Sequence, residues 1–416
     1  MLYDLAVIGG GAAGIAAAIS ASRVGDRVVI VESGSELGKK IQASGNGRCN
    51  LLNTGSPRYY GDTEFACHVI RLCGPKEQIR FWHSIGLLTA GENENRVYPC
   101  TFQSSTVLNI LKNALKLLGT EIILNSPVTD CRQDHALFFL SSGNASLSAR
   151  RVLIATGGPA GRKSSSTDSG YEILRQFGHR IMPLRPSLVP LVTDKRSISG
   201  LSGIRVRCTV SVLNRSNCVI HQEKGEVLFT DYGVSGICAM QCARFIDGDG
   251  CCLELDLVSS LFTDDRTLSD ELLFRKRTFG SLSPDTLLIG MLNARLSYAV
   301  MKQSGIPIRG ETLNDLEDSI LEDVARTLRH YRISVIGTRQ MTDAQVTAGG
   351  AECREFNPGN MESRLVPGLH AAGEILNTDG DCGGFNLMFA FGSGILAGLN
   401  NRKPSEIFGN EGREAL

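Results

Sequence analysis

The sequence lacks a net charge, because its 43 lysines and arginines are balanced by 43 aspartates and glutamates. A protein without an overall field of one sign has no general attraction for nucleic acid or for an anionic membrane surface. We therefore expect neither nucleic acid nor a membrane as a partner. A small molecule recognised at a specific site is the expected substrate.

Motifs of several common protein classes are also missing. No Gly-x-Ser-x-Gly elbow and no P-loop lysine motif occurs, which excludes the commonest hydrolases and NTPases. The 7 histidines do not show the His-x-x-x-His or Cys/His spacing of a metal site, so no metal is expected. The 13 cysteines include no Cys-x-x-Cys pair, which disfavours a disulfide reductase. No secretory signal opens the chain, so a reducing, cytoplasmic compartment is the simplest expectation.

A strand, a glycine-rich turn, a helix and a second strand are predicted between Asp4 and Glu32. Gly9, Gly11 and Gly14 fit Gly-x-Gly-x-x-Gly, a motif that provides a tight turn, backbone approach to a pyrophosphate and close helix packing. Glu32 follows 18 residues after Gly14, where a carboxylate can accept hydrogen bonds from ribose hydroxyls. An acidic residue there disfavours a 2′-phosphate, so the expected nucleotide is FAD or NAD, not NADP.

Two further apolar strands, Arg151 to Ala155 and Gly368 to Ala372, also run into glycines. Glu374 follows the second of them and is suited to binding ribityl hydroxyls. The helix predicted from Asn386 to Leu399 would present its backbone N–H groups to the negative charge of a reduced flavin. This C-terminal stretch favours FAD as the dinucleotide. If one sheet holds all three strands, the nucleotide domain must be discontinuous.

A polar, glycine-punctuated loop runs from Ser44 to Asn50. The planar guanidinium of Arg48 suits a phosphate or a substrate carboxylate. Cys49 allows a redox interpretation, although the next cysteine is Cys67. A packing role for Cys49 is the more ordinary alternative.

A β-rich segment is predicted from Pro190 to Leu257, with strands at Ile204 to Leu213, Val219 to His221 and Val227 to Phe229, and helical spacing follows up to Leu328. The stretch from Gly225 to Gly236 is interpreted in two ways. It is either the end of a β-hairpin or a loop that presents Asp231 and Tyr232 to the flavin.

The motifs together resemble a bacterial flavoprotein family of aminoacetone-oxidase-like FAD-binding enzymes and relatives of bile-acid 3-dehydro-Δ4 reductases. The segments that carry the resemblance are Val7 to Gly14, Ser44 to Asn50, Ser187 to Leu191, Gly225 to Gly236, Gln345 to Gly350, Met361 to Ser363 and Gly373 to Gly398. The chain departs from the family pattern at Asn377, where many relatives have Asp, at Asp231, where many have His, and at Arg162 to Asp168, where a Gly-Ser-Thr-Gly-type turn is usual. A proton donor at Asp231 would need a strongly raised pKa.

The resemblance implies an α/β fold, with a discontinuous, Rossmann-type FAD domain like that of glutathione reductase, an inserted β-barrel and a small helical subdomain. The expected boundaries are 1–189 and 341–416 for the FAD domain, 190–260 and 329–340 for the barrel, and 261–328 for the helical subdomain. The residues expected to bind FAD are Gly9, Gly11, Ala12, Ala13, Gly14, Glu32, Ser33, Lys40, Gly45, Arg48, Cys49, Asn50, Val128, Ala155, Thr156, Gly157, Gly373, Glu374, Gly384, Asn386 and Leu387.

The resemblance also implies an FAD-dependent oxidoreductase that transfers hydride between flavin N5 and an organic substrate. The leading hypothesis is an NAD(P)H-linked reductase of an enone such as a bile-acid or steroid-like 3-oxo-Δ4 ring, with Asp231 and Tyr232 as candidate proton donors. Two alternatives stay open. One is an amine or aminoketone oxidase that uses oxygen, and the other is a flavin-dependent factor that interacts with RNA or protein.

Overall fold

The chain forms two compact units, one of which is discontinuous in sequence. The computed structural model describes residues 2–143, 145–161, 169–246, 250–306 and 312–409. The first unit comprises Met1–Arg185 and Val346–Leu416, and the second is Pro186–Gln345. The helical segment belongs to the same unit as the barrel. The expected division into three domains stays a prediction.

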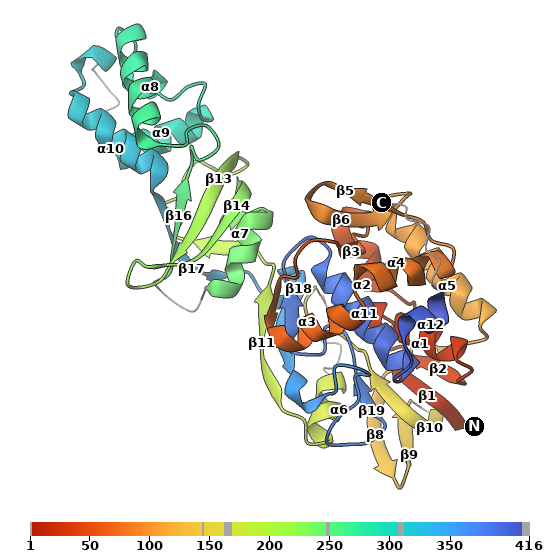
Figure 1. Cartoon of the computed structure of the whole chain (residues 1–416). Helices are drawn as coiled ribbons and strands as arrows, with labels where there is room; N and C mark the ends of the chain where they lie inside the picture. The colour runs from red at the N-terminus through yellow and green to blue at the C-terminus, as the bar shows by residue number, and fades with distance from the viewer. Residues whose placement is uncertain (1, 144, 162–168, 247–249, 307–311, 410–416) are drawn as a thin grey trace. The chain divides into compact units, whose positions relative to one another are not determined.

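A seven-stranded sheet organises the first unit, with strand order β7-β2-β1-β10-β9-β8 and β19 beside β10 (Figure 1). The bounds are β7 Glu121–Ile123, β2 Val28–Val31, β1 Leu2–Ile8, β10 Ala145–Ile154, β9 Leu137–Ser142, β8 Val128–Asp134 and β19 Leu369–Ala371. Strands β7, β2, β1, β10 and β19 pair in parallel, whereas β9 pairs antiparallel with both β10 and β8. Ile8 is in register with both Val31 and Ile154. The three strands predicted to end in glycines therefore share one sheet, and their carboxyl ends meet at one edge.

Two helices in the first unit are in backbone contact. A Cβ added at Gly394 of α11 (Phe385–Leu399) would lie 2.2 Å from the carbonyl oxygen of Ala13 in α1 (Ala12–Arg23). One added at Gly398 would lie 2.3 Å from the carbonyl oxygen of Ala17. Because both contacts advance by four residues, the helices run parallel. At 1.5 Å per residue, the N-terminus of α11 therefore extends about 12 Å beyond that of α1.

Smaller elements complete the first unit. The helices are α2 (Lys39–Ala43), α3 (Thr63–Leu72), α4 (Pro75–Ser84), α5 (Ser104–Leu117), α6 (Ser169–Gln176) and α12 (Pro404–Phe408). The short strands are β3 (Leu52–Asn53), β4 (Tyr59–Gly61), β5 (Thr89–Glu92), β6 (Arg96–Pro99), β11 (Ile181–Ser187), β18 (Val346–Ala351) and β20 (Thr378–Gly380).

The second unit contains a closed antiparallel barrel with strand order β12-β15-β14-β13-β16-β17. The bounds are β12 Leu191–Thr193, β13 Arg205–Leu213, β14 Val219–Phe229, β15 Gly233–Ser235, β16 Cys252–Asp256 and β17 Tyr331–Thr338, with α7 (Ile237–Cys242) packed on β14. The two strands predicted at Val219 to His221 and Val227 to Phe229 are one continuous strand. Cross-strand pairing with β13 carries β14 through the polar residues between them.

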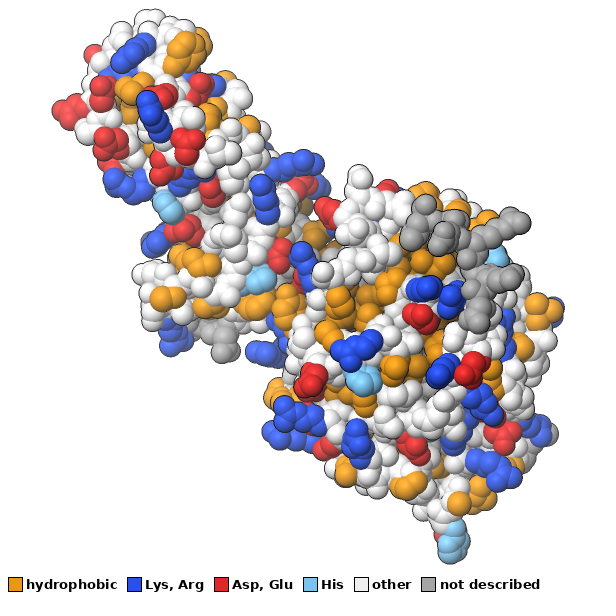
Figure 2. Space-filling model, in the orientation of Figure 1, with side chains coloured by type: hydrophobic (Ala, Val, Ile, Leu, Met, Phe, Trp, Pro, Cys, Tyr) orange, Lys and Arg blue, Asp and Glu red, His pale blue; other side chains and the backbone are white. Residues whose placement is uncertain are grey.

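In the described part of the segment between β16 and β17, the α-helices are α8 (Asp265–Thr278), α9 (Ala294–Gln303) and α10 (Asp318–Arg329). Asp264 caps α8 by accepting a hydrogen bond from the Thr267 N–H at 2.9 Å. None of the described helices is long and apolar enough to cross a membrane. On the face shown in Figure 2, acidic and basic side chains are interspersed.

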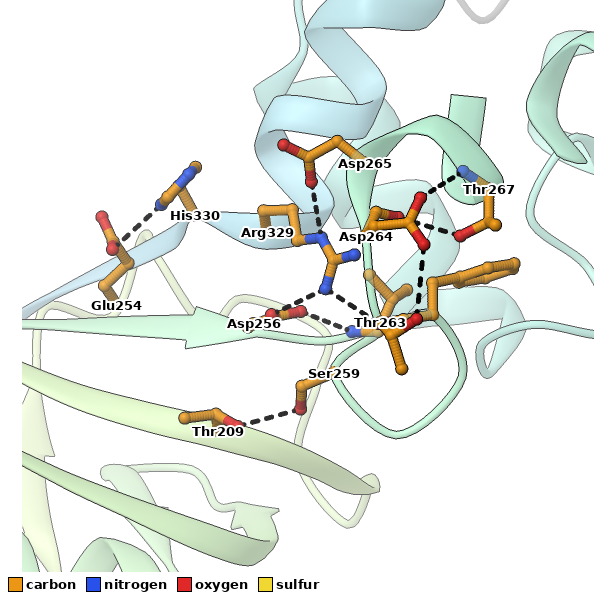
Figure 3. Close-up of polar contacts among 12 residues, drawn as sticks. Thr209, Glu254, Asp256, Ser259, Thr263, Asp264, Asp265, Thr267, Arg329 and His330 are labelled. Carbon is orange, nitrogen blue, oxygen red and sulfur yellow. Dashed lines mark hydrogen bonds and ion pairs between the residues drawn. The ribbon is translucent and has the colours of Figure 1, made fainter. Parts of the chain in front are cut away.

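Arg329 joins the barrel to these helices (Figure 3). Its Nη1 donates to Asp256 of β16 at 2.9 Å and to the carbonyl oxygen of Phe262 at 3.2 Å, and its Nε donates to Asp265 of α8 at 3.1 Å. The Arg329 side chain is only 13% exposed, and Asp256 is 25% exposed, whereas Asp265 is 87% exposed. The pair with Asp256 should therefore carry most of the stabilisation.

We expect Arg329→Ala to lower the free energy of unfolding of the second unit by about 2 to 3 kcal/mol, because Asp256 would keep a half-buried charge without its cation. Asp265→Asn should change it by less than about 1 kcal/mol, because exposed ion pairs contribute little. Urea unfolding followed by circular dichroism measures both. Equal effects of the two variants would show that the junction does not depend on the buried pair.

Candidate functional site

The N-terminal glycines shape an open approach to the start of α1. Gly9 has a φ of +105°, and a Cβ at that position would lie 2.5 Å from the carbonyl oxygen of Ala155. A Cβ at Gly14 would lie 2.0 Å from the carbonyl oxygen of Gly9. At Gly11, by contrast, a Cβ would meet no heavy atom of the described residues within 4 Å. The N-terminus of α1, with Ala12 and Ala13 in its first turn, is thus open to an anion.

Glu32 is fixed at the end of β2 by backbone donors. Its carboxylate accepts hydrogen bonds from the N–H groups of Gly10 at 2.7 Å and Gly34 at 2.6 Å, and from the Ser33 hydroxyl at 3.3 Å. A carboxylate has about four acceptor positions, so capacity remains for ribose hydroxyls. Val128, at the start of β8, is buried. It lies two residues after Ser126, whose N–H donates to the Glu32 carbonyl oxygen.

Glu374 forms an ion pair that neither residue alone predicts. Lys40 of α2 donates to Glu374 at 2.7 Å and to the carbonyl oxygen of Gly158 at 3.0 Å, while the Thr347 N–H donates to the other Glu374 oxygen at 2.8 Å. Burial alone would raise the pKa of Glu374, but Lys40 and the backbone donors hold this pKa below its usual value. The carboxylate is therefore ionised at neutral pH.

The N-terminus of α11 is lined by an unpaired polar atom. Gly384 precedes the helix with a φ of +103°, and a Cβ there would lie 2.8 Å from Asn50 Oδ1. This buried amide oxygen has no hydrogen-bond partner among the described residues. Such an atom requires a donor, and the imide N–H of a flavin ring is one of suitable chemistry. The Asn386 side chain exchanges hydrogen bonds with Gly380 at 2.7 and 2.8 Å and thereby holds its own loop, and its part in binding FAD stays a prediction.

The other predicted strand-end residues lie at the same edge of the sheet. The Ala155 N–H continues the ladder by donating to the Ile8 carbonyl oxygen at 2.8 Å. Gly157 has a φ of +67°, and a Cβ added there would lie 3.6 Å from Glu374 Oε2. Thr156 packs under α6, because a Cβ on Gly170 would lie 2.1 Å from its hydroxyl. The segment from Arg162 to Asp168, where the chain departs from the family's Gly-Ser-Thr-Gly-type turn, lies outside the described residues.

The remaining residues expected to bind FAD lie at the end of β19 and in the first turn of α11. A Cβ on Gly373 would lie 2.8 Å from the Ala13 Cβ, so β19 ends in close contact with α1. Leu387 is half-buried against the core. The open α1 N-terminus, two fixed carboxylates and the polar start of α11 thus fit a dinucleotide that extends from one helix N-terminus to the other.

The loop from Ser44 to Asn50 adopts a backbone that is rare for ordinary residues. Gly45 has a φ of +56° and Cys49 a φ of +58°. Cys49 is fully buried, and burial raises the pKa of its thiol to about 11. Because the thiolate is the reactive form, a packing role is favoured over a redox role. Arg48 lies over aromatic rings and pairs with Glu92 at 2.7 Å.

Asp231 and Tyr232 form the turn between β14 and β15, in which the Thr230 N–H donates to the Gly233 carbonyl oxygen at 2.8 Å. The hairpin interpretation of this segment therefore agrees with the structure. Asp231 is exposed, and the Arg339 guanidinium lies over the Tyr232 ring at 4.9 Å from its centroid. The role of either side chain as a proton donor stays a prediction.

Three further residues were not recognised from the sequence as candidates for this site. The Thr347 N–H donates to the Glu374 carboxylate, and the Thr347 hydroxyl accepts a hydrogen bond from the Ala160 N–H at 3.1 Å. Asn53 donates to the Gly383 carbonyl oxygen at 2.9 Å, and the buried Arg96 Nε has no partner among the described residues. Thr347 lies within one of the family motifs, but a threonine in a buried strand has no chemical signature of its own.

We expect Lys40→Met to lower the free energy of unfolding at pH 7 by about 1 to 2 kcal/mol, less than for a fully buried pair because Lys40 is 43% exposed. In the wild type, the lowered pKa of Glu374 means that its charge contributes stability above about pH 4.3, which is lost as the pH falls through the lowered folded value. In the variant, the backbone donors remain but the cation is lost, so burial moves that pKa upward and the variant loses stability as the pH rises.

The difference in the free energy of unfolding between wild type and Lys40→Met should therefore be largest at neutral pH and should disappear near pH 4. Urea unfolding across this pH range measures it, with Lys39→Met, at the exposed neighbouring lysine, as the control. A difference that does not depend on pH would contradict the ion-pair assignment.

Comparison with known proteins identifies full-length relatives. Residues 3–400 match the family model described as HI0933-like protein Rossmann domain. The 3-dehydro-bile acid delta(4,6)-reductase of Clostridium scindens is 32% identical over 404 residues, which cover 95% of this chain and 98% of that protein. The ribosomal RNA dihydrouridine synthase of Haemophilus influenzae is 26% identical over 407 residues, which cover 95% of this chain and 97% of that protein.

A solved structure supports the fold assignment. The 3-ketosteroid delta1-dehydrogenase from Sterolibacterium denitrificans gives a TM-score of 0.50 at 12% identity, and the match covers 96% of this chain and 99% of that protein. At this level of identity, the likeness shows a shared fold and no more.

Proposed function

Since this chain belongs to the HI0933-like family and is an FAD-dependent oxidoreductase, we propose that it reduces a carbon–carbon double bond conjugated to a carbonyl group. The proposed substrate is a 3-oxo-Δ4 bile acid or a steroid-like enone, and NAD(P)H is the proposed electron donor. The observation that carries the proposal is the 32% identity, over nearly the whole chain, to a reductase named for such a bile acid.

The names of the two kinds of relative describe the same type of reaction, the reduction of a double bond conjugated to a carbonyl group. A 3-oxo-Δ4 ring contains an enone, and uridine contains a ring double bond conjugated to the C4 carbonyl. In both, reduction places a hydride on the β-carbon and a proton on the α-carbon. Two electrons leave NAD(P)H, and the overall reaction consumes one proton.

FAD, when bound, supplies the hydride-transferring centre at N5. We assign the pyrophosphate to the N-terminus of α1 at Gly11 and the adenosine ribose to Glu32. The ribityl chain is assigned to Glu374, which Lys40 keeps ionised. The N-terminus of α11 would stabilise negative charge at the flavin.

The proton donor is assigned to the barrel turn, with Tyr232 and Asp231 as candidates. Tyr232 is the better of the two, because a phenol O–H is a hydrogen-bond donor. Asp231 is exposed and lacks the burial that a carboxyl donor requires. We also propose a cytoplasmic location, which suits a chain with no disulfide among its described residues.

Reduction of a uridine in ribosomal RNA is the second candidate, favoured by the full-length match at 26% identity. The balanced charge weighs against it, because binding to a polyanion usually depends on basic side chains. An oxygen-dependent amine or aminoketone oxidase is the third candidate, and no reported relative favours it.

The proposal is tested by mixing the anaerobically reduced protein with a 3-oxo-Δ4 bile acid. We expect the oxidised flavin absorbance to return and the product to gain two hydrogens, whereas the corresponding saturated ketone leaves the flavin reduced. A uridine-containing RNA tests the second candidate in the same way. If neither acceptor reoxidises the flavin, but oxygen does so and hydrogen peroxide forms with an amine substrate, the reductase proposal fails.

For the proton donor, Tyr232→Phe should lower kcat about 100-fold, because general acid catalysis commonly contributes that much. Asp231→Asn, at an exposed position, should change kcat by no more than about twofold. Steady-state rates with the enone, together with KM values, measure both. A larger loss in Asp231→Asn would transfer the role to that carboxyl, and unchanged rates in both variants would exclude the turn.

A further inference from the structure

Three segments of the first unit with unusual backbone geometry are joined at one place. Non-glycine residues with left-handed φ values occur in the loop from Ser44 to Asn50, at residues 94 and 95, and at Phe102. Such conformations are unfavourable for ordinary residues and persist where the surrounding structure enforces them, often at ligand sites. The short sheet β3-β6-β5 connects all three segments.

Arg48, in the first of these segments, contacts Phe102 in the third and two residues of the sheet between them. Its guanidinium lies 4.5 Å from the ring centroid of Tyr98 and 4.7 Å from that of Phe102, and its Nη2 donates to Glu92 at 2.7 Å. The two rings lie 5.5 Å apart and are tilted by 39°. The aromatic faces hold the planar cation in one orientation without consuming its N–H donors.

The partner of Arg48 is exchangeable. Arg48 and Glu92 have side chains that are 42% and 36% exposed, so their ion pair is solvated and weak. Most of the five N–H donors of Arg48 remain available to another oxyanion. An arginine oriented by aromatic rings and paired only at the surface is suited to binding a carboxylate or phosphate in two-point geometry.

This cluster is connected to the N-terminus of α11. Asn53 donates both to the Glu94 carbonyl oxygen at 3.1 Å and to the Gly383 carbonyl oxygen at 2.9 Å. Arg96 pairs with Glu94, and a Cβ on Gly383 would lie 3.6 Å from the Arg96 Nε. The segment that carries Arg48 also ends at Asn50, whose unpaired oxygen faces Gly384.

We propose that Arg48, held by Tyr98 and Phe102, is the anchor for an anionic group of the substrate, which displaces Glu92 when it binds. The anchor selects substrates that combine the reducible double bond with a separate oxyanion. That oxyanion is the side-chain carboxylate of a bile acid or a phosphate of RNA. The assignment rests on the proposed function for the identity of the substrate, but its test depends on binding alone.

The test titrates the FAD-loaded protein with a 3-oxo-Δ4 bile acid and, separately, with its methyl ester, and follows the perturbation of the flavin absorbance. Arg48→Gln should weaken binding of the free acid about tenfold, the effect of losing one charge-assisted hydrogen bond, and leave the ester within about twofold. Arg71→Gln, at an exposed position on α3, removes the same charge and should change neither.

The Glu92→Gln variant distinguishes an anion-binding role of Arg48 from a purely structural one. Removing the competing carboxylate frees Arg48, so the free acid should bind several-fold more tightly, whereas loss of a purely structural contact would weaken binding or leave it unchanged. In a parallel arm, a uridine-containing oligonucleotide replaces the bile acid. The ligand whose affinity rises in Glu92→Gln and falls in Arg48→Gln identifies the source of the oxyanion.

Equal losses for acid and ester in Arg48→Gln, or no gain for any anion in Glu92→Gln, would overturn the assignment. These outcomes are distinct from a failure of the proposed function. If the acid binds with the expected pattern but is not reduced, the anchor stands and the reductase proposal falls. If the enone is reduced without dependence on its carboxylate, the reverse holds.

Discussion

The backbone contact between α1 and α11 is the constraint on which the site depends. Ala13 and Ala17 lie against Gly394 and Gly398 so closely that a single added carbon would fall 2.2 to 2.3 Å from a carbonyl oxygen. Any larger side chain at these glycines would force the helices apart. The contact also sets the parallel orientation and the stagger, so that two helix N-termini from opposite ends of the chain point toward one elongated ligand.

Electrostatics then divides the ligand site along its length. The helix N-termini provide partial positive charge and contain no acidic residue in their first turns. Glu32 and Glu374 supply the negative charge, and each is fixed by backbone N–H donors. Anionic parts of a dinucleotide match the helix ends, and its sugar hydroxyls match the carboxylates. Lys40 pairs with the partly buried Glu374 and helps to keep it ionised.

The sequence allowed much of this arrangement to be predicted, because local rules govern it. Glycine spacing at Gly9, Gly11 and Gly14, a carboxylate at the end of the next strand, and glycines after two later strands each have a physical reason that does not depend on distant residues. The inclusion of all three strands in one sheet, in which they run parallel, and hence a discontinuous unit, followed from the same pattern and is confirmed.

Features that arise from distant pairing could not be predicted. Lys40 and Glu374 are separated by 334 residues, and each was expected to contact the cofactor on its own. The side-chain hydrogen bonds by which Asn386 holds the preceding loop were not expected, and its contact with the cofactor stays a prediction. Polar residues within β14 concealed a continuous strand, because pairing with β13 outweighs local propensity. Arg48 was expected to bind a phosphate or a carboxylate, which stays a prediction, and its aromatic support from Tyr98 and Phe102 was not expected.

The central claim is that two segments from opposite ends of the chain together hold FAD. The most direct test is the absorbance spectrum of the purified protein, followed by identification and quantification of the released flavin. The account predicts a yellow protein that releases FAD in a 1:1 ratio to the chain. A colourless protein that takes up no added FAD would contradict it.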